Sequence, residues 1–234
     1  IGDNTWIGSN VTIFDGARIG SNCRIFPGAV ISAIPQDLKF KGEQTTAIIG
    51  DHTTIRECVT INKGTVAMGR TEIGSHCLLM AYVHIAHDCI IGDHVILANS
   101  VNLAGHVTIE DWAILEGYVG VSQFMHIGAH SFIAGQSGVR KNVPPFVKAA
   151  REPLSYAGIN SVGLARRGYE KEVIEDIQNI YRTIFQKGYN TSKALSMVEE
   201  ECPTSAHRDL ILQFVRSSEK GIIRGLSGSM MKTE

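Results

Sequence analysis

The chain has 234 residues and a formal net charge of −1, with 22 basic and 23 acidic side chains. Such a balance provides no overall field that would attract nucleic acid or an anionic membrane surface. No apolar run reaches the roughly 20 residues that a membrane-spanning helix needs, and the sequence shows no basic-then-apolar signal segment. We therefore expect a cytoplasmic protein. The chain starts at Ile1, within a repeat, so we also expect residues upstream.

Most of the chain follows a hexapeptide repeat. An aliphatic side chain occupies every sixth position from Ile73 to Val139, and the same phase recurs over residues 1–25 and at Ile49 and Ile55. A helix would need an apolar period of 3.6 and an amphipathic strand a period of 2. A period of six is typical of a parallel β-helix, in which three hexapeptides complete one triangular coil of stacked repeats. The sequence therefore predicts a prism over residues 1–150.

The repeat loses phase at residues 31–48 and 62–72, and we expect loops extruded from the prism at both places. Loops on a rigid scaffold often carry function, and the first loop holds Asp37 and Lys39 close together. The repeat stops after Pro145. Apolar stripes at helical spacing over residues 173–185 and 206–217 predict a small helical domain in residues 151–234, with a loose tail at 227–234.

The five cysteines fit neither a disulfide framework nor a zinc ribbon, because their number is odd and their spacings match no CxxC pattern. Cys23, Cys77 and Cys89 share one phase of the repeat, where valine, alanine, threonine and serine also occur. We interpret them as small core residues that stay reduced.

The stretch 79–88 (LMAYVHIAHD) is the candidate for chemistry. Because three hexapeptides make one coil, equivalent positions of successive coils stack, and several groups gather on one corner of two or three adjacent coils: His84, His87, Asp88, Gly105, His106 and Gln123. A neutral histidine can take a proton from a hydroxyl, and a carboxylate on its other nitrogen makes it a better base. A glycine one coil away leaves its N–H open to an oxyanion. The spacing thus predicts a general-base site.

Three other interpretations remain open at this point. In the first, the histidines are merely polar turn residues. In the second, His84, His87 and His106 bind zinc, as in the trimeric zinc carbonic anhydrases that share the hexapeptide repeat. Zinc would occupy the base, and Asp88 suits an oriented base equally well, so we expect neither a metal nor another cofactor. In the third, the prism is a scaffold without catalysis.

Several motifs together resemble the bacterial UDP-N-acetylglucosamine O-acyltransferase family. They are QDLK at 36–39, IRECVTINKGT at 55–65, HIAHD at 84–88, LAGH at 103–106 and GLARRGY at 163–169. The resemblance covers essentially the whole chain. It implies an all-β, left-handed parallel β-helix followed by a small α-helical C-terminal domain, with a hand opposite to the usual crossover rule. It also implies a homotrimer with active sites between neighbouring prisms.

The activity that this resemblance implies is the first step of lipid A synthesis. An (R)-3-hydroxyacyl chain passes from acyl carrier protein to the 3-hydroxyl of UDP-N-acetylglucosamine. His87 matches the family's general base, Asp88 the residue that orients it, and the N–H of Gly105 the oxyanion donor. Gly135 matches the position that limits acyl length, and Gly117, one coil earlier in the same column, implies an open column and a long acyl chain.

Further positions match substrate contacts of the family. The sugar and acyl contacts are Asp37, Lys39, His84, His106, Ser122 and Gln123, and the contacts to the nucleotide diphosphate are Asn160 and Arg166. The chain departs from well-known members at Asn62 and Ser122, where they carry histidine; Ser122 still offers one hydrogen bond. Cations late in the chain form a candidate patch for docking the acidic carrier protein: Arg140, Lys141, Lys148, Arg151, Arg166, Arg167, Arg208 and Arg216.

Overall fold

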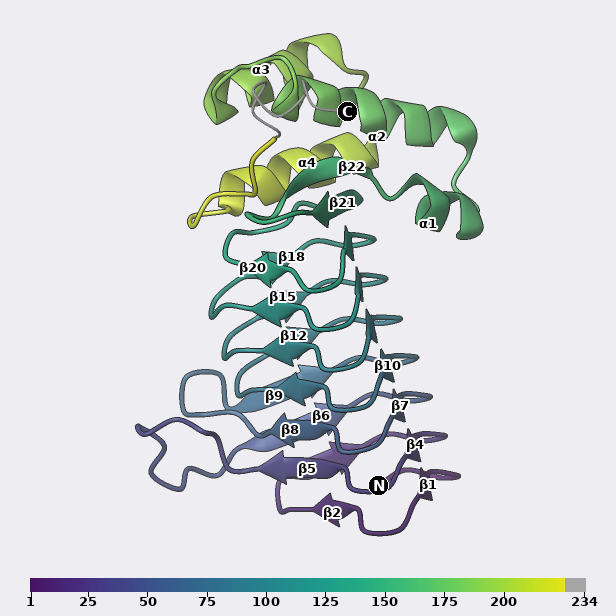
Figure 1. Ribbon diagram of the computed structural model, residues 1–234, viewed down its shortest axis with the longest axis vertical. Coiled ribbons are helices and arrows are strands. Elements are labelled where there is room, and N and C mark those ends of the chain that lie inside the picture. Colours follow the sequence, from purple (N-terminus) through teal and green to yellow (C-terminus); the bar gives the residue numbers. More distant parts are fainter. Residues whose placement is uncertain (226–234) are drawn as a thin grey trace.

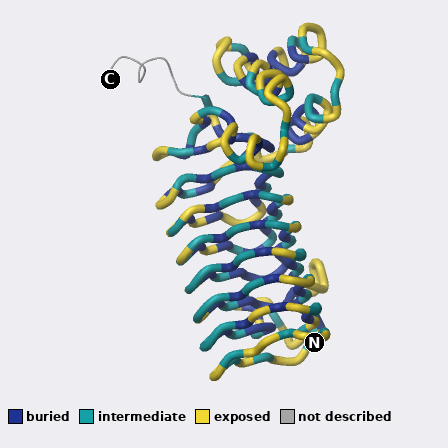
Figure 2. Tube along the Cα trace, turned by 90° about the vertical axis from the view of Figure 1, so that its right-hand side faces the viewer, coloured by how far each residue is buried: buried dark blue, intermediate teal, exposed yellow. Residues whose placement is uncertain are grey.

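The computed structural model describes residues 1–225, and the tail at 227–234 lies outside the described residues. A stack of coils forms the long body of the molecule, and the helices cover its C-terminal end (Figure 1). Buried positions run as an inner row through successive coils (Figure 2). The hexapeptide repeat therefore produces the parallel β-helix that the sequence predicts.

Three sheets form the walls of the prism, and each of the six coils from β1 to β18 contributes one short strand to each wall. Sheet A holds β1 (Trp6–Ile7), β4 (Arg24–Ile25), β7 (Thr54–Ile55), β10 (Leu78–Leu79), β13 (Ile96–Leu97), β16 (Ile114–Leu115), β19 (Phe132–Ile133), β21 (Val147–Ala150) and β22 (Ser155–Ile159). Sheet B holds β2 (Thr12–Ile13), β5 (Val30–Ala33), β8 (Thr60–Asn62), β11 (His84–Ile85), β14 (Asn102–Leu103), β17 (Gly120–Val121) and β20 (Gly138–Val139). Sheet C holds β3 (Ala17–Ile19), β6 (Thr46–Ile49), β9 (Arg70–Ile73), β12 (Ile90–Ile91), β15 (Thr108–Ile109) and β18 (His126–Ile127).

The pairing register confirms a coil of three hexapeptides. Leu79 pairs in parallel with Leu97, and Leu97 pairs with Leu115. These three side chains are 0 % exposed, so the aliphatic of each hexapeptide stacks on its equivalents inside the prism. A coil buries this row only when its neighbours are in place, which makes the array stiff along its axis.

The pairing register also gives the lengths of the two insertions. Arg24 pairs with Thr54, and Thr54 pairs with Leu78, so both of these coils are longer than three hexapeptides. The first coil is longer by two repeat lengths, which lie between β5 and β6, and the second by one repeat length, which lies between β8 and β9. Both insertions lie where the sequence loses its phase, and both precede a strand of sheet C.

Each corner of the prism carries a residue with left-handed backbone, and many of these are not glycine. His76, His94 and Asp88 have φ values of 58°, 57° and 60°. Histidine and aspartate tolerate this region better than most residues do. At one corner the rings stack along the axis, with His76 and His94 centroids 4.8 Å apart and His94 and Trp112 centroids 3.9 Å apart.

The three cysteines in phase with the repeat are core residues, as expected. Cys23, Cys77 and Cys89 are buried, and all five cysteines are free. Burial raises the pKa of Cys89 to about 12 and that of Cys77 to about 11. These thiols are therefore protonated at neutral pH, which suits inert packing.

Four helices follow the coils within the described residues: α1 (Ser161–Arg166), α2 (Lys171–Phe185), α3 (Thr191–Glu201) and α4 (Ala206–Ser217). The two apolar stripes read from the sequence are α2 and α4, and Asn190 caps α3 by accepting from Lys193 N. The sequence did not reveal helix α1 or strand β22. Strand β22 pairs antiparallel with β21 and extends sheet A past residue 150.

We propose residues 1–150 and 151–234 as two domains. Within residues 1–225, no helix has the length and apolar character that crossing a membrane requires.

Candidate active site

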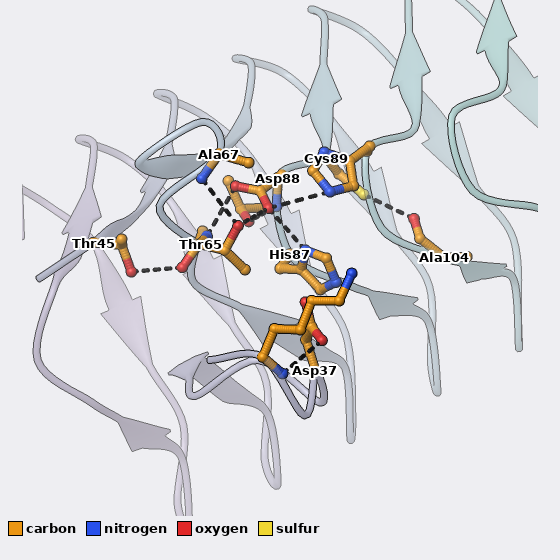
Figure 3. Close-up of polar contacts among 12 residues, drawn as sticks. Asp37, Thr45, Thr65, Ala67, His87, Asp88, Cys89 and Ala104 are labelled. Carbon is orange, nitrogen blue, oxygen red and sulfur yellow. Dashed lines mark hydrogen bonds and ion pairs between the residues drawn. The ribbon is translucent and has the colours of Figure 1, made fainter. Parts of the chain in front are cut away.

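His87 and Asp88 lie at the corner between β11 of sheet B and β12 of sheet C. The His87 Nδ1 atom is 2.8 Å from Asp88 Oδ2 (Figure 3). Both residues are buried, at 7 % and 2 % exposure. An ionised carboxylate only accepts hydrogen bonds, so the neutral ring carries its proton on Nδ1 and keeps a lone pair on Nε2. This is the tautomer that a general base requires.

Thr65, in the second insertion, holds the Asp88 carboxylate in place. Its N–H donates to Oδ1 at 2.9 Å and its hydroxyl to Oδ2 at 2.6 Å (Figure 3). Burial acts to raise the pKa of Asp88, but the hydrogen bonds from Thr65 and His87 outweigh it and lower the pKa below its usual value. The carboxylate therefore stays ionised and keeps the His87 ring in one orientation.

Gly105 lies one coil above His87, in contact with its ring. A Cβ on Gly105 would come within 2.6 Å of His87 Cε1 and 2.7 Å of Nε2, and His106 N donates to His87 O at 3.1 Å. At another corner, Ser75 and Asp93 occupy the same repeat position as Gly105. Each directly precedes a histidine with left-handed backbone, as Gly105 precedes His106. Aspartate oxygens of the next coil accept from the N–H groups of Ser75 and Asp93 at 2.6 and 2.8 Å. An N–H at this repeat position thus suits an oxygen anion.

His106 completes the cluster on the next turn. Its Nε2 is 3.6 Å from Asp88 Oδ2, and its ring meets the His87 ring edge-on with centroids 5.1 Å apart. One nitrogen or oxygen from each of His87, Asp88 and His106 lies within 4.8 Å of the others. His84 is not in this group; its Nδ1 lies 2.7 Å from Thr60 Oγ1. A metal ion here would use Asp88 in place of His84.

The remaining sugar and acyl candidates divide between a loop and the corner. Asp37 and Lys39 lie between β5 and β6, where Lys39 N donates to Asp37 Oδ1 at 3.0 Å (Figure 3). Ser122 and Gln123 follow β17 on the same corner as His87 and are exposed. Phe124, which the sequence analysis did not single out, stacks on His106 with centroids 4.6 Å apart.

Arg166 and Asn160 lie on a different wall. A cavity of about 450 Å³ opens on sheet A beside α1, and its lining includes Ile114, Phe132, Lys148, Asn160, Val162 and Arg166. The Asn160 side chain caps α1, because Oδ1 accepts from Gly163 N at 3.2 Å, and Nδ2 donates to His130 O at 2.9 Å. The structure therefore does not bring Asn160 and Arg166 together with His87, which lies between sheets B and C, within one chain.

Gly135 lies in contact with the coil of Gly117. A Cβ on Gly135 would be 3.1 Å from Gly117 O. Glu116 lies beside this pair, and its Oε2 accepts from Gly135 N at 3.0 Å. The column is therefore free of bulky side chains at both glycines but carries a carboxylate at its side.

Comparison with known proteins places this arrangement in a family. The bacterial transferase hexapeptide model matches residues 1–33 and 70–105, and the model described as UDP N-acetylglucosamine O-acyltransferase, domain 2, matches residues 142–223. An acyl-[acyl-carrier-protein]–UDP-N-acetylglucosamine O-acyltransferase from Pseudomonas syringae is 42 % identical over 80 % of this chain and 73 % of its own length. One from Janthinobacterium is 45 % identical over 83 % and 76 %. The chain belongs to the UDP-N-acetylglucosamine O-acyltransferase family.

Solved structures of the family share the whole fold. The UDP-N-acetylglucosamine acyltransferase of Bacteroides fragilis is 47 % identical, superimposes with a TM-score of 0.92, and the match covers 95 % of this chain and 94 % of that one. The enzyme of Francisella novicida is 41 % identical, with a TM-score of 0.94 and coverage of 98 % and 84 %. The chain is thus a left-handed parallel β-helix with a helical C-terminal part, as in its acyltransferase relatives.

Asn62 and Ser122, the two positions where the sequence analysis expects histidine in this family, have different surroundings. Asn62 is buried, its Nδ2 donates to Ile34 O at 3.1 Å, and its Oδ1 finds no hydrogen-bond partner among the described residues. It therefore ties the first insertion to β8. Ser122 is exposed, so its hydroxyl can face a ligand.

Proposed function

We propose that this chain transfers an (R)-3-hydroxyacyl group from acyl carrier protein to the 3-hydroxyl of UDP-N-acetylglucosamine, the first step of lipid A synthesis. The family relatives support the acyltransferase reaction, and the contact between His87, Asp88 and Gly105 supports the mechanism. The contact of His87 with both the Asp88 carboxylate and Gly105 is the observation that carries the proposal.

The reaction balances with these groups. His87 Nε2 takes the proton of the sugar hydroxyl as its oxygen attacks the thioester carbonyl carbon. The N–H of Gly105 donates to the oxyanion of the tetrahedral intermediate. The intermediate collapses, the carbon–sulfur bond breaks, and the carrier's sulfur leaves and receives the proton from His87. Asp88, held by Thr65, stabilises the imidazolium between the two steps.

We further propose a homotrimer whose sites form between copies. The catalytic corner lies between sheets B and C, whereas the cavity with Lys148 and Arg166 opens on sheet A. A guanidinium suits diphosphate geometry, and both features serve one substrate only if sheet A of one copy faces the corner of the next. Such a head-to-tail contact closes into a ring.

Mixing two inactive variants tests the shared site. We expect His87→Ala and Arg166→Ala each to lower activity strongly, and a co-assembled mixture to regain up to about a quarter of the wild-type rate, because random pairing restores that share of interfaces. The measurement is the initial rate of the mixture against each variant alone. A mixture no more active than the better variant would refute the shared site.

A panel of acyl-carrier thioesters of different lengths, with UDP-N-acetylglucosamine as acceptor, tests the reaction itself. We expect wild type to prefer a long 3-hydroxyacyl chain and Gly135→Met to prefer a shorter one. The methionine would fill the column where a Cβ already meets Gly117 O at 3.1 Å. If no thioester supports transfer, the proposed function is rejected. If the variant prefers the same chain length as wild type, Gly135 does not limit acyl length.

The carrier protein would dock through cations near the helices. Several members of the predicted patch are paired with acids: Arg140 with Glu152, Arg208 with Asp209 and Arg216 with Glu199. Lys148 and Arg166 line the cavity on sheet A. We therefore assign the nucleotide to these last two. Arg167 binds Trp112 O and contacts His130, so we leave the docking of the carrier to Lys141 and Arg151, for which the described residues show no acidic partner.

A further inference from the structure

One coil residue, His130, contacts both ends of helix α1. At the start of the helix, the His130 carbonyl accepts from Asn160 Nδ2 at 2.9 Å. At its end, Arg167 NH1 lies 3.4 Å from His130 Nδ1, and the Tyr169 hydroxyl lies 3.1 Å from Nε2. Arg167 also donates to Trp112 O at 3.0 Å. Because α1 has only six residues, it depends on these anchors for its position.

The chemistry of these partners selects one form of the His130 ring. A guanidinium only donates, so Nδ1 must accept, and the neutral ring carries its proton on Nε2 and donates to the Tyr169 oxygen. Burial, and then the adjacent Arg167 guanidinium, lower the pKa of His130 to about 4, while Asp111 acts in the opposite direction. The ring is therefore neutral at physiological pH, and both of its nitrogens have partners.

Arg166, the last residue of α1, lies between these anchors, and its position follows from theirs. Arg166 is exposed and lines the sheet A cavity together with Lys148. A long cationic side chain binds a phosphate tightly only if its backbone is already held in the bound position, since ordering it on binding costs free energy.

We propose that His130 is a positioning residue for nucleotide binding: by holding both ends of α1 on the coil, it fixes Arg166 beside the sheet A cavity. This inference rests on the proposed function, since the ligand is the uridine diphosphate part of the sugar nucleotide. His130 itself contacts neither the nucleotide nor the reacting atoms, which lie at the corner of another wall.

His130→Phe tests the side-chain anchor at the end of α1. Phenylalanine keeps the stacking on Phe146 and Trp112 and the backbone carbonyl that accepts from Asn160, but it loses both ring nitrogens. We expect the variant to bind UDP about tenfold more weakly, as expected for a lost hydrogen bond to a charged group. The KM for UDP-N-acetylglucosamine should rise by the same factor, with kcat and the KM for the acyl carrier unchanged. Calorimetric titration with UDP and steady-state kinetics measure these effects.

Three further variants separate positioning from packing. Tyr169→Phe removes one hydroxyl and should weaken UDP binding by a smaller factor. His76→Phe is the matched control, because His76 occupies the same repeat position three coils before His130 and stacks between His52 and His94. It should bind UDP as wild type does. In an Arg166→Ala background, His130→Phe should have little further effect on UDP affinity.

The outcomes are distinct. Additive losses in the double variant, an equal fall in affinity for the acyl carrier, or unchanged UDP binding in both His130→Phe and Tyr169→Phe would overturn the positioning role. A wild-type chain that binds no UDP would reject the nucleotide site itself, and with it the proposed function. Tyr169→Phe keeps the test valid if His130→Phe folds poorly.

Discussion

His87→Ala is expected to lower kcat by roughly 10²–10⁴-fold, the usual contribution of a positioned base. Alanine removes the Nε2 lone pair that would accept the sugar proton in the proposed mechanism. Thr65 continues to bind both oxygens of Asp88, so the corner and the coils should remain intact. The KM for UDP-N-acetylglucosamine should change little, because the lost interaction acts in the transition state. Initial rates at saturating substrates measure the effect.

The control for this variant is His52→Ala. His52 is exposed and stacks on His76 at another corner, with ring centroids 4.7 Å apart. It should retain wild-type kinetics. If His87→Ala keeps a rate within about twofold of wild type while remaining folded, proton abstraction by His87 is rejected.

Gly105→Ala should lower kcat by about 10²-fold, the order of loss that a displacement near 1 Å causes at a catalytic group. The new Cβ would lie 2.6 Å from His87 Cε1, so the imidazole must move away from its place beside Asp88. The obstacle is a movable side chain rather than backbone, so we expect a change in melting temperature of only a few degrees. Kinetics and thermal unfolding of the same preparation separate the two effects.

Gly120→Ala is the matched comparison for this substitution. A Cβ at Gly120, on β17 of the following coil, would meet nothing within 4 Å. The rate and melting temperature of this variant should stay close to those of wild type. Wild-type activity in Gly105→Ala would show that contact between Gly105 and His87 is irrelevant to transfer.

The coil and its register were predictable because they follow from the hexapeptide repeat, which recurs through most of the chain. An inward aliphatic every sixth residue leaves a single way to stack Leu79, Leu97 and Leu115, and the pairing confirms it. The same spacing predicted that Gly105 lies beside His87, since backbone register, and not side-chain packing, sets that contact.

The residues that hold the site in place were not predictable, because they lie where the hexapeptide repeat is interrupted or has ended. Thr65 lies in an insertion whose path no period describes, so its hydrogen bonds to Asp88 could not be read from spacing. The capping role of Asn160 required knowledge of α1, a helix too short to give a sequence pattern. That Arg166 faces a different wall from His87 depends on how the helices settle on the last coil, which is a tertiary property.

The hydrogen bond from His106 N to His87 O has a consequence for how such an enzyme changes over time. His87, the proposed base, and Gly105, the proposed oxyanion donor, belong to adjacent rungs. The spacing of their backbones is therefore the strand spacing, ~4.8 Å, and a substitution can move the imidazole but cannot change the distance between rungs. Length can be gained by adding entire rungs or by lengthening a corner, as the two insertions do. Either route therefore leaves the backbone spacing between His87 and Gly105 unchanged, and alters only the loops and coils around these two residues.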